Sequence, residues 1–180
     1  MFFSCSKSGD SGSSSFVPKL AIGQSYAGGI IFYLDATGQH GLVCATTDQS
    51  TGAVWDASSN ATSSNYYPTQ TFTTDTAIGT GAANTSQIIN VLGRNGVAAS
   101  LCRNYRGGGY HDWSLPSEDE LNELYKNSAV VGGLASDYYW SSSEYVGSYA
   151  TVAWSQYFSN GTQSTNLKYA TYYVRAVRAF

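Results

Sequence analysis

Strand-forming patterns lie at both ends of this sequence, and helix-forming patterns lie between them. Near the N-terminus, the apolar runs 28–34 and 41–46 flank the segment 35–38, which has turn chemistry, so we expect a β-hairpin. The chain has 180 residues, of which 42% are hydrophobic, and this is enough for one core but not for two independent domains. We therefore expect a single folded domain over residues 16–180.

The middle of the chain carries the helical patterns. Residues 84–86 offer N-caps for a helix that runs through Leu92, and a second apolar face covers residues 97–103. The third helix is marked best, because Ser117 and Glu120 have the spacing of a capping box. Two or three helices are expected from these signals.

Strand patterns return after the helices. Residues 138–140 and the alternating run 152–158 favour strands, the dipeptide Asn160-Gly161 is typical of a hairpin turn, and residues 172–178 predict the last strand. The segment 48–81 has no sustained period, and it is interpreted as a long ordered loop.

Composition excludes several classes of protein. Charged residues make up only 12% of the chain and the net charge is -3, so the chain has no basic field for nucleic acid. His40 and His111 are the only histidines; His111 beside Asp112 resembles a base with its orienting carboxylate, but we expect a structural role for this pair. We expect no catalytic residue, no metal site and no cofactor.

The first fifteen residues differ from the rest. Apolar residues and a small residue precede Cys5, and a Ser/Gly-rich segment follows it, which is the order found at the end of a bacterial lipoprotein signal. We expect residues 1–15 to be a tether with the lipid on Cys5, and the protein to lie at the bacterial cell surface. The alternatives are an ordinary disordered tail and a place in a phage virion.

Five blocks of sequence together resemble the Lcl C-terminal domain family of bacterial surface and phage-associated proteins. The blocks are GGIIFYLDATGQHGLV (28–43), HDWSLPSEDELNELYKN (111–127), YWSSSEY (139–145), AWSQYFSNG (153–161) and YVRAVRAF (173–180). The resemblance implies an α+β, C-type-lectin-like fold with two or three helices packed on small antiparallel β-sheets. It also implies that the N- and C-terminal strands lie close together.

The C-terminal part is also similar to proteins that are diversified by retroelements, whose targets often end in a block like 174–178. Eight of the fifteen tyrosines lie from residue 138 onward, and Glu144 is the only charged residue in 139–167. Tyr with Ser, Thr, Asn and Gly is the composition of antibody binding sites. The resemblance therefore implies a variable ligand-binding face, with these candidate positions: Val146, Ser148, Tyr149, Thr151, Ser155, Tyr157, Thr162, Ser164, Thr165, Asn166, Leu167, Tyr169, Ala170, Thr171 and Tyr172.

Fixed framework residues are expected between and around the variable ones. Trp140, Trp154 and Phe158 are assigned to the core, Trp113 anchors the loop before the third helix, and further members of this framework are Glu144, Lys168, Arg175 and Arg178. Cys44 and Cys102 lack the spacing of a zinc site, so they either form one disulfide or are two buried small hydrophobes.

The function expected from these patterns is ligand binding rather than catalysis. The ligand is expected to be a protein or glycan on another cell or a phage, and the membrane is contacted only through the lipid on Cys5. One alternative is a bacterial adhesin or fimbrial-type domain that uses the same face without variation. A less favoured alternative is an enzyme of the formylglycine-generating type, which needs active-site cysteines that no segment of this chain matches.

Overall fold

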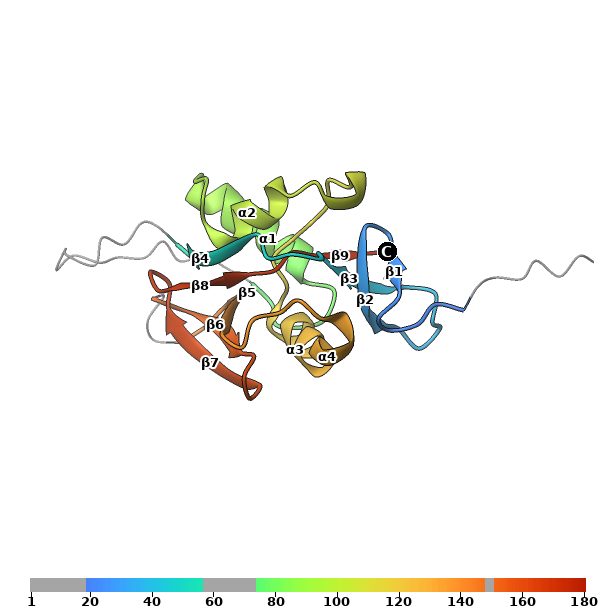
Figure 1. Cartoon of the computed structure of the whole chain (residues 1–180). Helices are drawn as coiled ribbons and strands as arrows, with labels where there is room; N and C mark the ends of the chain where they lie inside the picture. The colour runs from blue at the N-terminus through green and yellow to red at the C-terminus, as the bar shows by residue number, and fades with distance from the viewer. Residues whose placement is uncertain (1–18, 57–73, 148–150) are drawn as a thin grey trace, which may run out of the picture.

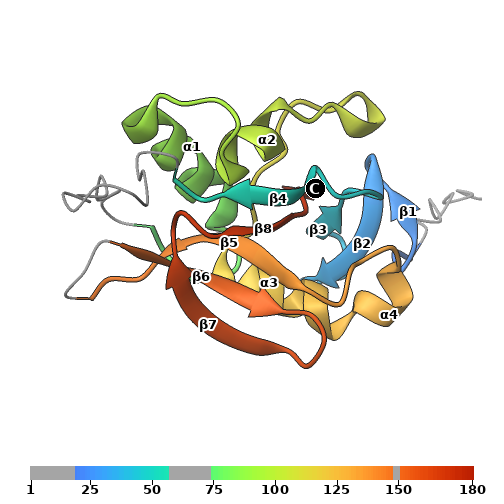
Figure 2. The same cartoon turned by 60° about the vertical axis from the view of Figure 1, so that its left-hand side comes forward.

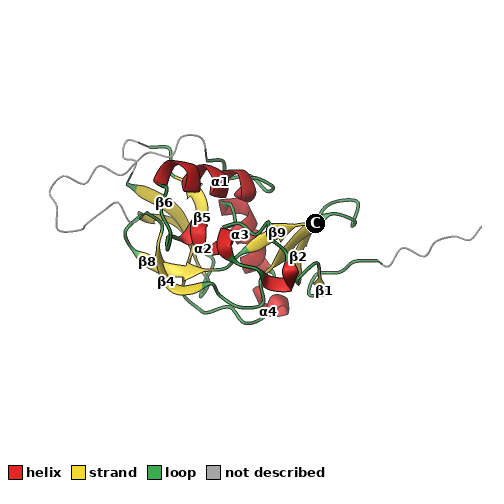
Figure 3. Ribbon diagram, turned by 90° about the horizontal axis from the view of Figure 1, so that it is seen from above, coloured by secondary structure: helices red, strands yellow, loops and turns green. Residues whose placement is uncertain are grey.

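The computed structural model describes residues 19–56, 74–147 and 151–180. Two β-sheets lie toward opposite ends of the molecule, and helices lie between and around them (Figure 1), as the view from above also shows (Figure 3). None of the helices in these ranges is long and apolar enough to cross a membrane. The architecture is a mixed one, consistent with the expected α+β class.

The four-stranded sheet brings the two ends of the domain together. Its order is β1-β2-β3-β9, and all neighbouring strands are antiparallel. The strands are β1 (Ser25–Tyr26), β2 (Gly29–Leu34), β3 (Gly41–Cys44) and β9 (Val177–Ala179). The N-terminal hairpin is confirmed, and the last strand lies beside it as expected.

The five-stranded sheet has the order β4-β8-β5-β6-β7. Its strands are β4 (Ser50–Val54), β5 (Tyr138–Glu144), β6 (Val152–Tyr157), β7 (Thr162–Leu167) and β8 (Thr171–Val174). The hairpin at Asn160-Gly161 is confirmed: Gly161 has a φ of 81°, and a Cβ there would lie 2.3 Å from Cε1 of Tyr125. The sheet is not wholly antiparallel, because β5 and β8 are parallel.

The expected last strand is broken into β8 and β9, which belong to different sheets. The break falls at Arg175 and Ala176, where the backbone N–H of Ala176 donates to Oε1 of Gln49 at 2.5 Å instead of to a strand. The buried Arg175 guanidinium donates to the carbonyl oxygens of Ala45 and Gly133. The same register corrects the expected loop 48–81, whose residues 50–54 form β4 because they pair with β8.

Four α-helices occur in the described ranges: α1 (Gly81–Leu92), α2 (Ala98–Asn104), α3 (Glu118–Lys126) and the single turn α4 (Ser128–Val131). The capping box of α3 is confirmed, with Glu120 N–H donating to Ser117 Oγ and Ser117 N–H donating to Glu120 Oε2. α1 begins before the expected caps. Asn84 and Thr85 lie inside it and are buried, because they bond to the neighbouring segments through Asp75 and Leu115.

α1 and α2 lie on one side of the five-stranded sheet and α3 lies on the other (Figure 2), while α4 packs against β2 of the four-stranded sheet. Two hydrophobic clusters result. Trp55, Trp113 and Trp140 belong to the first cluster, and Leu124 and Tyr139 belong to the second.

The two described cysteines are free thiols. Cys102 is buried in the first hydrophobic cluster and Cys44 in the second. The structure therefore has no Cys44–Cys102 disulfide, and both residues occupy their sites as small hydrophobes.

Candidate ligand-binding face

Three tyrosines form a stacked row across neighbouring strands of the five-stranded sheet. Tyr138 in β5 lies opposite Tyr157 in β6, and their ring centroids are 4.6 Å apart at an interplanar angle of 26°. On its other side, Tyr138 stacks on Tyr172 of β8, with centroids 5.0 Å apart at 25°. All three rings are half-buried, so each leaves part of its surface open. We refer to Tyr138, Tyr157 and Tyr172 as the tyrosine row.

Trp140 supports the tyrosine row at Tyr172. The ring of Tyr172 lies 4.6 Å from that of Trp140, which is fully buried and donates from Nε1 to the carbonyl oxygen of Ala53 at 2.9 Å. Because Trp140 is held by both packing and a hydrogen bond, it gives the row a rigid support.

The strand β7 extends this face with polar side chains. Thr162 pairs with Tyr157 and Ser164 pairs with Ser155, so by strand alternation both lie on the same face as the row. Asn166 lies on it too, and its Nδ2 donates to Ser155 Oγ at 2.8 Å and to Ser164 Oγ at 3.0 Å. The face therefore combines aromatic area with hydroxyl and amide groups.

Most of the expected variable positions that the structure describes keep exposed surface. Exposed positions are Val146, Thr162, Leu167, Tyr169 and Thr171. Half-buried positions are Thr151, Tyr157, Ser164, Thr165, Asn166, Ala170 and Tyr172. Ser155 departs from the expectation, because it is 2% exposed beneath the Asn166 amide. Ser148 and Tyr149 lie outside the described residues, as does Cys5.

These positions do not form one surface. Strand alternation places Thr165 and Leu167 on the face of β7 opposite to Thr162 and Ser164. Conversely, Tyr138 was not expected on the binding face, although it is the centre of the tyrosine row. Only the cross-strand register places Tyr138 there, and a single sequence does not fix that register.

Lys168 anchors the loop that leads from β7 to β8. Its side chain is fully buried, forms an ion pair with Glu144, and lies 4.5 Å above the Trp55 ring. Its carbonyl oxygen accepts hydrogen bonds from the backbone N–H groups of Trp55 and Asp56. Burial lowers the pKa of Lys168, and the hydrogen bond and charge of Glu144 oppose that shift. The exposed Tyr169 and Thr171 thus follow a fixed point in the chain.

A family model for the Lcl C-terminal domain matches residues 44–178. This range covers β4 to β8 and the start of β9, and so includes the entire tyrosine row. The chain belongs to the Lcl C-terminal domain family. Comparison with curated proteins gives no match.

The framework of this Lcl C-terminal domain is largely placed as expected. Trp113 is fully buried and donates from Nε1 to the Gly107 carbonyl oxygen at 3.2 Å. Phe158 is buried, and Arg175 also pairs with Asp48 at 2.7 Å. Trp154 departs from its core assignment: it is only half-buried, and it lines a hollow together with Glu118, the first residue of α3.

His111 and Asp112 resembled an acid–base dyad in the sequence, but Asp112 is bonded to Arg178 of the Lcl C-terminal domain. The Asp112 carboxylate accepts from Nε of Arg178 at 2.5 Å, and the Arg178 guanidinium lies 3.7 Å from the centre of the Tyr110 ring. His111 itself is exposed. Within the described ranges, no three His, Cys, Asp or Glu side chains gather as metal ligands.

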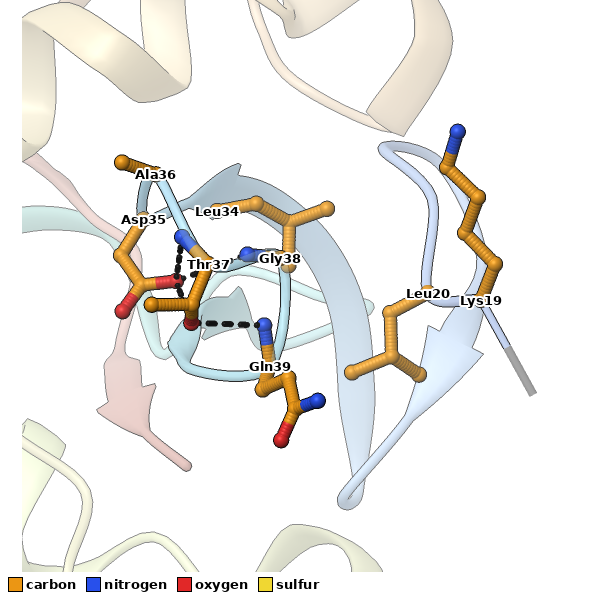
Figure 4. Close-up of a pocket in the computed structure, with 8 residues that line it drawn as sticks. All are labelled: Lys19, Leu20, Leu34, Asp35, Ala36, Thr37, Gly38 and Gln39. Carbon is orange, nitrogen blue, oxygen red and sulfur yellow. Dashed lines mark hydrogen bonds between the residues drawn. The ribbon is translucent and has the colours of Figure 1, made fainter. Parts of the chain in front are cut away.

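A separate pocket lies beside the β2–β3 turn, N-terminal to the residues that the family model matches (Figure 4). Its most polar group is Asp35, whose Oδ1 accepts hydrogen bonds from the Thr37 hydroxyl and from the backbone N–H groups of Thr37 and Gly38. These bonds, led by that of the Thr37 hydroxyl, lower the pKa of Asp35. The carboxylate thus stabilises the turn.

Proposed function

We propose that this domain is a C-type-lectin-like binding module that contacts a macromolecular ligand through the tyrosine row and the polar side chains of β7. The observation that carries the proposal is the row itself: three half-buried tyrosine rings stack on one another, and the ring at one end, Tyr172, packs at a tilt on the buried Trp140. Tyrosine gives a large amphipathic contact area at a small loss of side-chain entropy. Thr162, Ser164 and Asn166 add hydrogen-bonding groups that adapt to different partners.

The position of the face favours display at a surface. The described N-terminal residues and the C-terminus meet at the four-stranded sheet, where the rings of Tyr26 and Phe180 pack edge to face. β6 and β7 lie toward the other end of the molecule (Figure 1). A lipid on Cys5 would therefore hold the domain from the end away from its ligand. The proposed location is the bacterial cell surface, with a phage virion as the alternative.

We further propose that the exposed positions of this face are diversified by a retroelement. Structural tolerance supports this proposal, since Thr162, Tyr169 and Thr171 are exposed while the framework residue Lys168 is buried. Sequencing the surrounding DNA tests this proposal. A reverse-transcriptase gene and a near-copy of the 3′ coding region that differs at adenines are expected, and without both the face is that of a fixed adhesin.

Binding to intact bacterial cells and to a glycan array tests the binding proposal. The fluorescently labelled full-length chain is compared with Tyr138→Ser and Tyr157→Ser, and with Tyr26→Ser as the matched control on an exposed tyrosine of β1. We expect both row variants to lose binding and the control to keep it. Protease treatment of the cells then separates a protein ligand from a glycan. Equal binding by all four chains contradicts the proposed face.

A further inference from the structure

A hollow lies at the N-terminal end of α3, over the outer part of β6. It has a volume of about 440 Å³, and the side chains that define it come from Glu118, Glu144, Tyr145, Val146 and Trp154. Thr74, Asp75 and Thr76 complete its rim. We refer to it as the tryptophan hollow. Strand alternation places Trp154 on the face of β6 opposite to the tyrosine row, so the two surfaces are distinct.

Two aromatic side chains form one wall of the hollow. The rings of Trp154 and Tyr145 are 6.0 Å apart at 72°, in an edge-to-face arrangement. The Tyr145 ring also rests against Gly147, where an added Cβ would lie 2.0 Å from Tyr145 Cε1. Tyr145 is 43% exposed and Trp154 is half-buried, so both keep open surface. This wall offers electron-rich ring faces to a ligand.

Glu118 lines the same hollow as the two aromatic rings and brings a carboxylate to it. Its backbone is fixed at both groups: the N–H donates to Ser143 Oγ at 3.0 Å, and the carbonyl oxygen accepts from Gln163 Nε2 at 3.3 Å. Across the described ranges, no side chain or backbone group pairs with its carboxylate. Burial, and then the charge of Asp119, raise the pKa of Glu118 to about 6.

The other two carboxylates of the hollow are already engaged. Glu144 is paired with Lys168 from the interior side. Asp75 accepts hydrogen bonds at Oδ1 from the backbone N–H groups of Thr76 and Ala77. Of the three, Glu118 is therefore the carboxylate with neither oxygen bonded to another described residue.

An anionic ligand does not suit this place, although a helix begins there. The first N–H groups of α3 are used internally, because Glu118 donates to Ser143, Asp119 donates to the Thr76 carbonyl oxygen, and Glu120 donates to Ser117 Oγ. No lysine or arginine is among the lining residues. The open groups are thus aromatic faces and one carboxylate, which together attract a cation.

We propose that the tryptophan hollow binds an arginine side chain of a protein ligand, with the guanidinium group against Trp154 and Tyr145 and hydrogen-bonded to the Glu118 carboxylate. Arginine fits better than lysine because its planar group both stacks on an aromatic ring and donates to a carboxylate. The inference rests on the proposed function in one respect, that the ligand is a protein.

Titration with small probes tests the hollow without knowledge of the natural ligand. N-acetyl-arginine amide is added to the full chain at pH 7.5, and the indole N–H resonance of Trp154 is followed by NMR. N-acetyl-citrulline amide, which has nearly the same shape and no charge, is the matched probe. We expect the arginine probe to shift the Trp154 resonance in a saturable way and the citrulline probe to bind about tenfold more weakly or not at all.

Two variants with the same change in charge separate a specific site from general attraction. Glu118→Gln is expected to weaken the arginine probe about tenfold, since it removes the charged acceptor, whereas Asp119→Asn on the exposed side of α3 changes binding less than about twofold. Equal binding of both probes, or equal loss in both variants, overturns the proposal. The cell-binding assay with the Tyr138 and Tyr157 variants is a separate measurement. A failure of the arginine proposal can therefore be distinguished from a failure of the proposed binding face.

Discussion

Lys168 and Glu144 form an ion pair in the interior of the domain, 24 residues apart in the chain. The pair joins the end of β5 to the loop between β7 and β8, directly beside the exposed positions of the proposed face. Because the ion pair is buried, it stabilises the framework and is not exposed to a ligand.

Loss of either charge breaks this buried ion pair. We expect Lys168→Ala to lower the free energy of unfolding by about 3–5 kcal/mol, because Glu144 then stays buried without its cation. Lys126→Ala is the control: Lys126 pairs with Glu123 at the surface, where removal costs less than about 1 kcal/mol. Urea unfolding measures both. Similar midpoints for the two variants would contradict the framework role of Lys168.

Ser155 and Ser164 lie opposite each other in β6 and β7 but differ in burial. We expect Ser155→Tyr to destabilise the domain by about 1–3 kcal/mol, since the larger side chain overpacks a closed site. Ser164→Tyr stays within about 0.5 kcal/mol of the wild type. Thermal unfolding of the pair checks the prediction, and tolerance of both changes would mean that Asn166 does not close the site over Ser155.

The raised pKa of Glu118 predicts a dependence of stability on pH. Between its ordinary pKa of 4.5 and its folded value of about 6, the folded chain holds a proton that the unfolded chain releases, so this group lowers stability as pH rises. Glu118→Gln removes this pH-dependent loss of stability. Because the carboxylate is partly exposed to solvent, we expect the variant to gain less than about 1 kcal/mol relative to the wild type between pH 4 and pH 7.5.

The measurement for Glu118 is the difference in unfolding free energy between variant and wild type at the two pH values, so that other titrating groups cancel. A difference that does not change with pH, or that moves in favour of the wild type, is inconsistent with a partly desolvated carboxylate at this position.

The thiols of Cys44 and Cys102 should be unreactive in the folded domain. Burial raises the pKa of Cys44 to about 11, and burial raises the pKa of Cys102 still further. In a Cys5→Ser background, we expect no reaction with Ellman's reagent at pH 8 until denaturant is added, and then two thiols per chain. Rapid reaction of the native protein, or no free thiol after unfolding, would show that the cysteines are accessible or bonded.

Local patterns predicted the elements whose causes are local. The capping box of Ser117 and Glu120 placed the start of α3, and Asn160-Gly161 placed the β6–β7 turn, because both depend on a few neighbouring residues. α1 began earlier than its apparent caps, since Asn84 and Thr85 form hydrogen bonds to distant segments instead.

Features that depend on the pairing register between strands could not be predicted from local sequence patterns. The segment 172–178 looks like one strand, yet the buried Arg175 interrupts it, and β4 exists only because β8 lies beside it. In the candidate site, composition pointed to the region after residue 138 but did not resolve its two faces. Tyr138 joined the tyrosine row and Ser155 left the surface because of pairings that one sequence does not fix.

The central claim is that the face around the tyrosine row is a binding surface on a tolerant framework. Two displayed libraries of equal size test it most directly, one randomised at Tyr138, Tyr157, Thr162 and Ser164, and the other at Ala82, Ala83, Asn90 and Val91 of α1. Both are selected against lysozyme. We expect folded binders with a Kd of about 1 µM or tighter from the first library and none from the second. Equal numbers of binders from both libraries, or a first library that does not fold, would contradict the account.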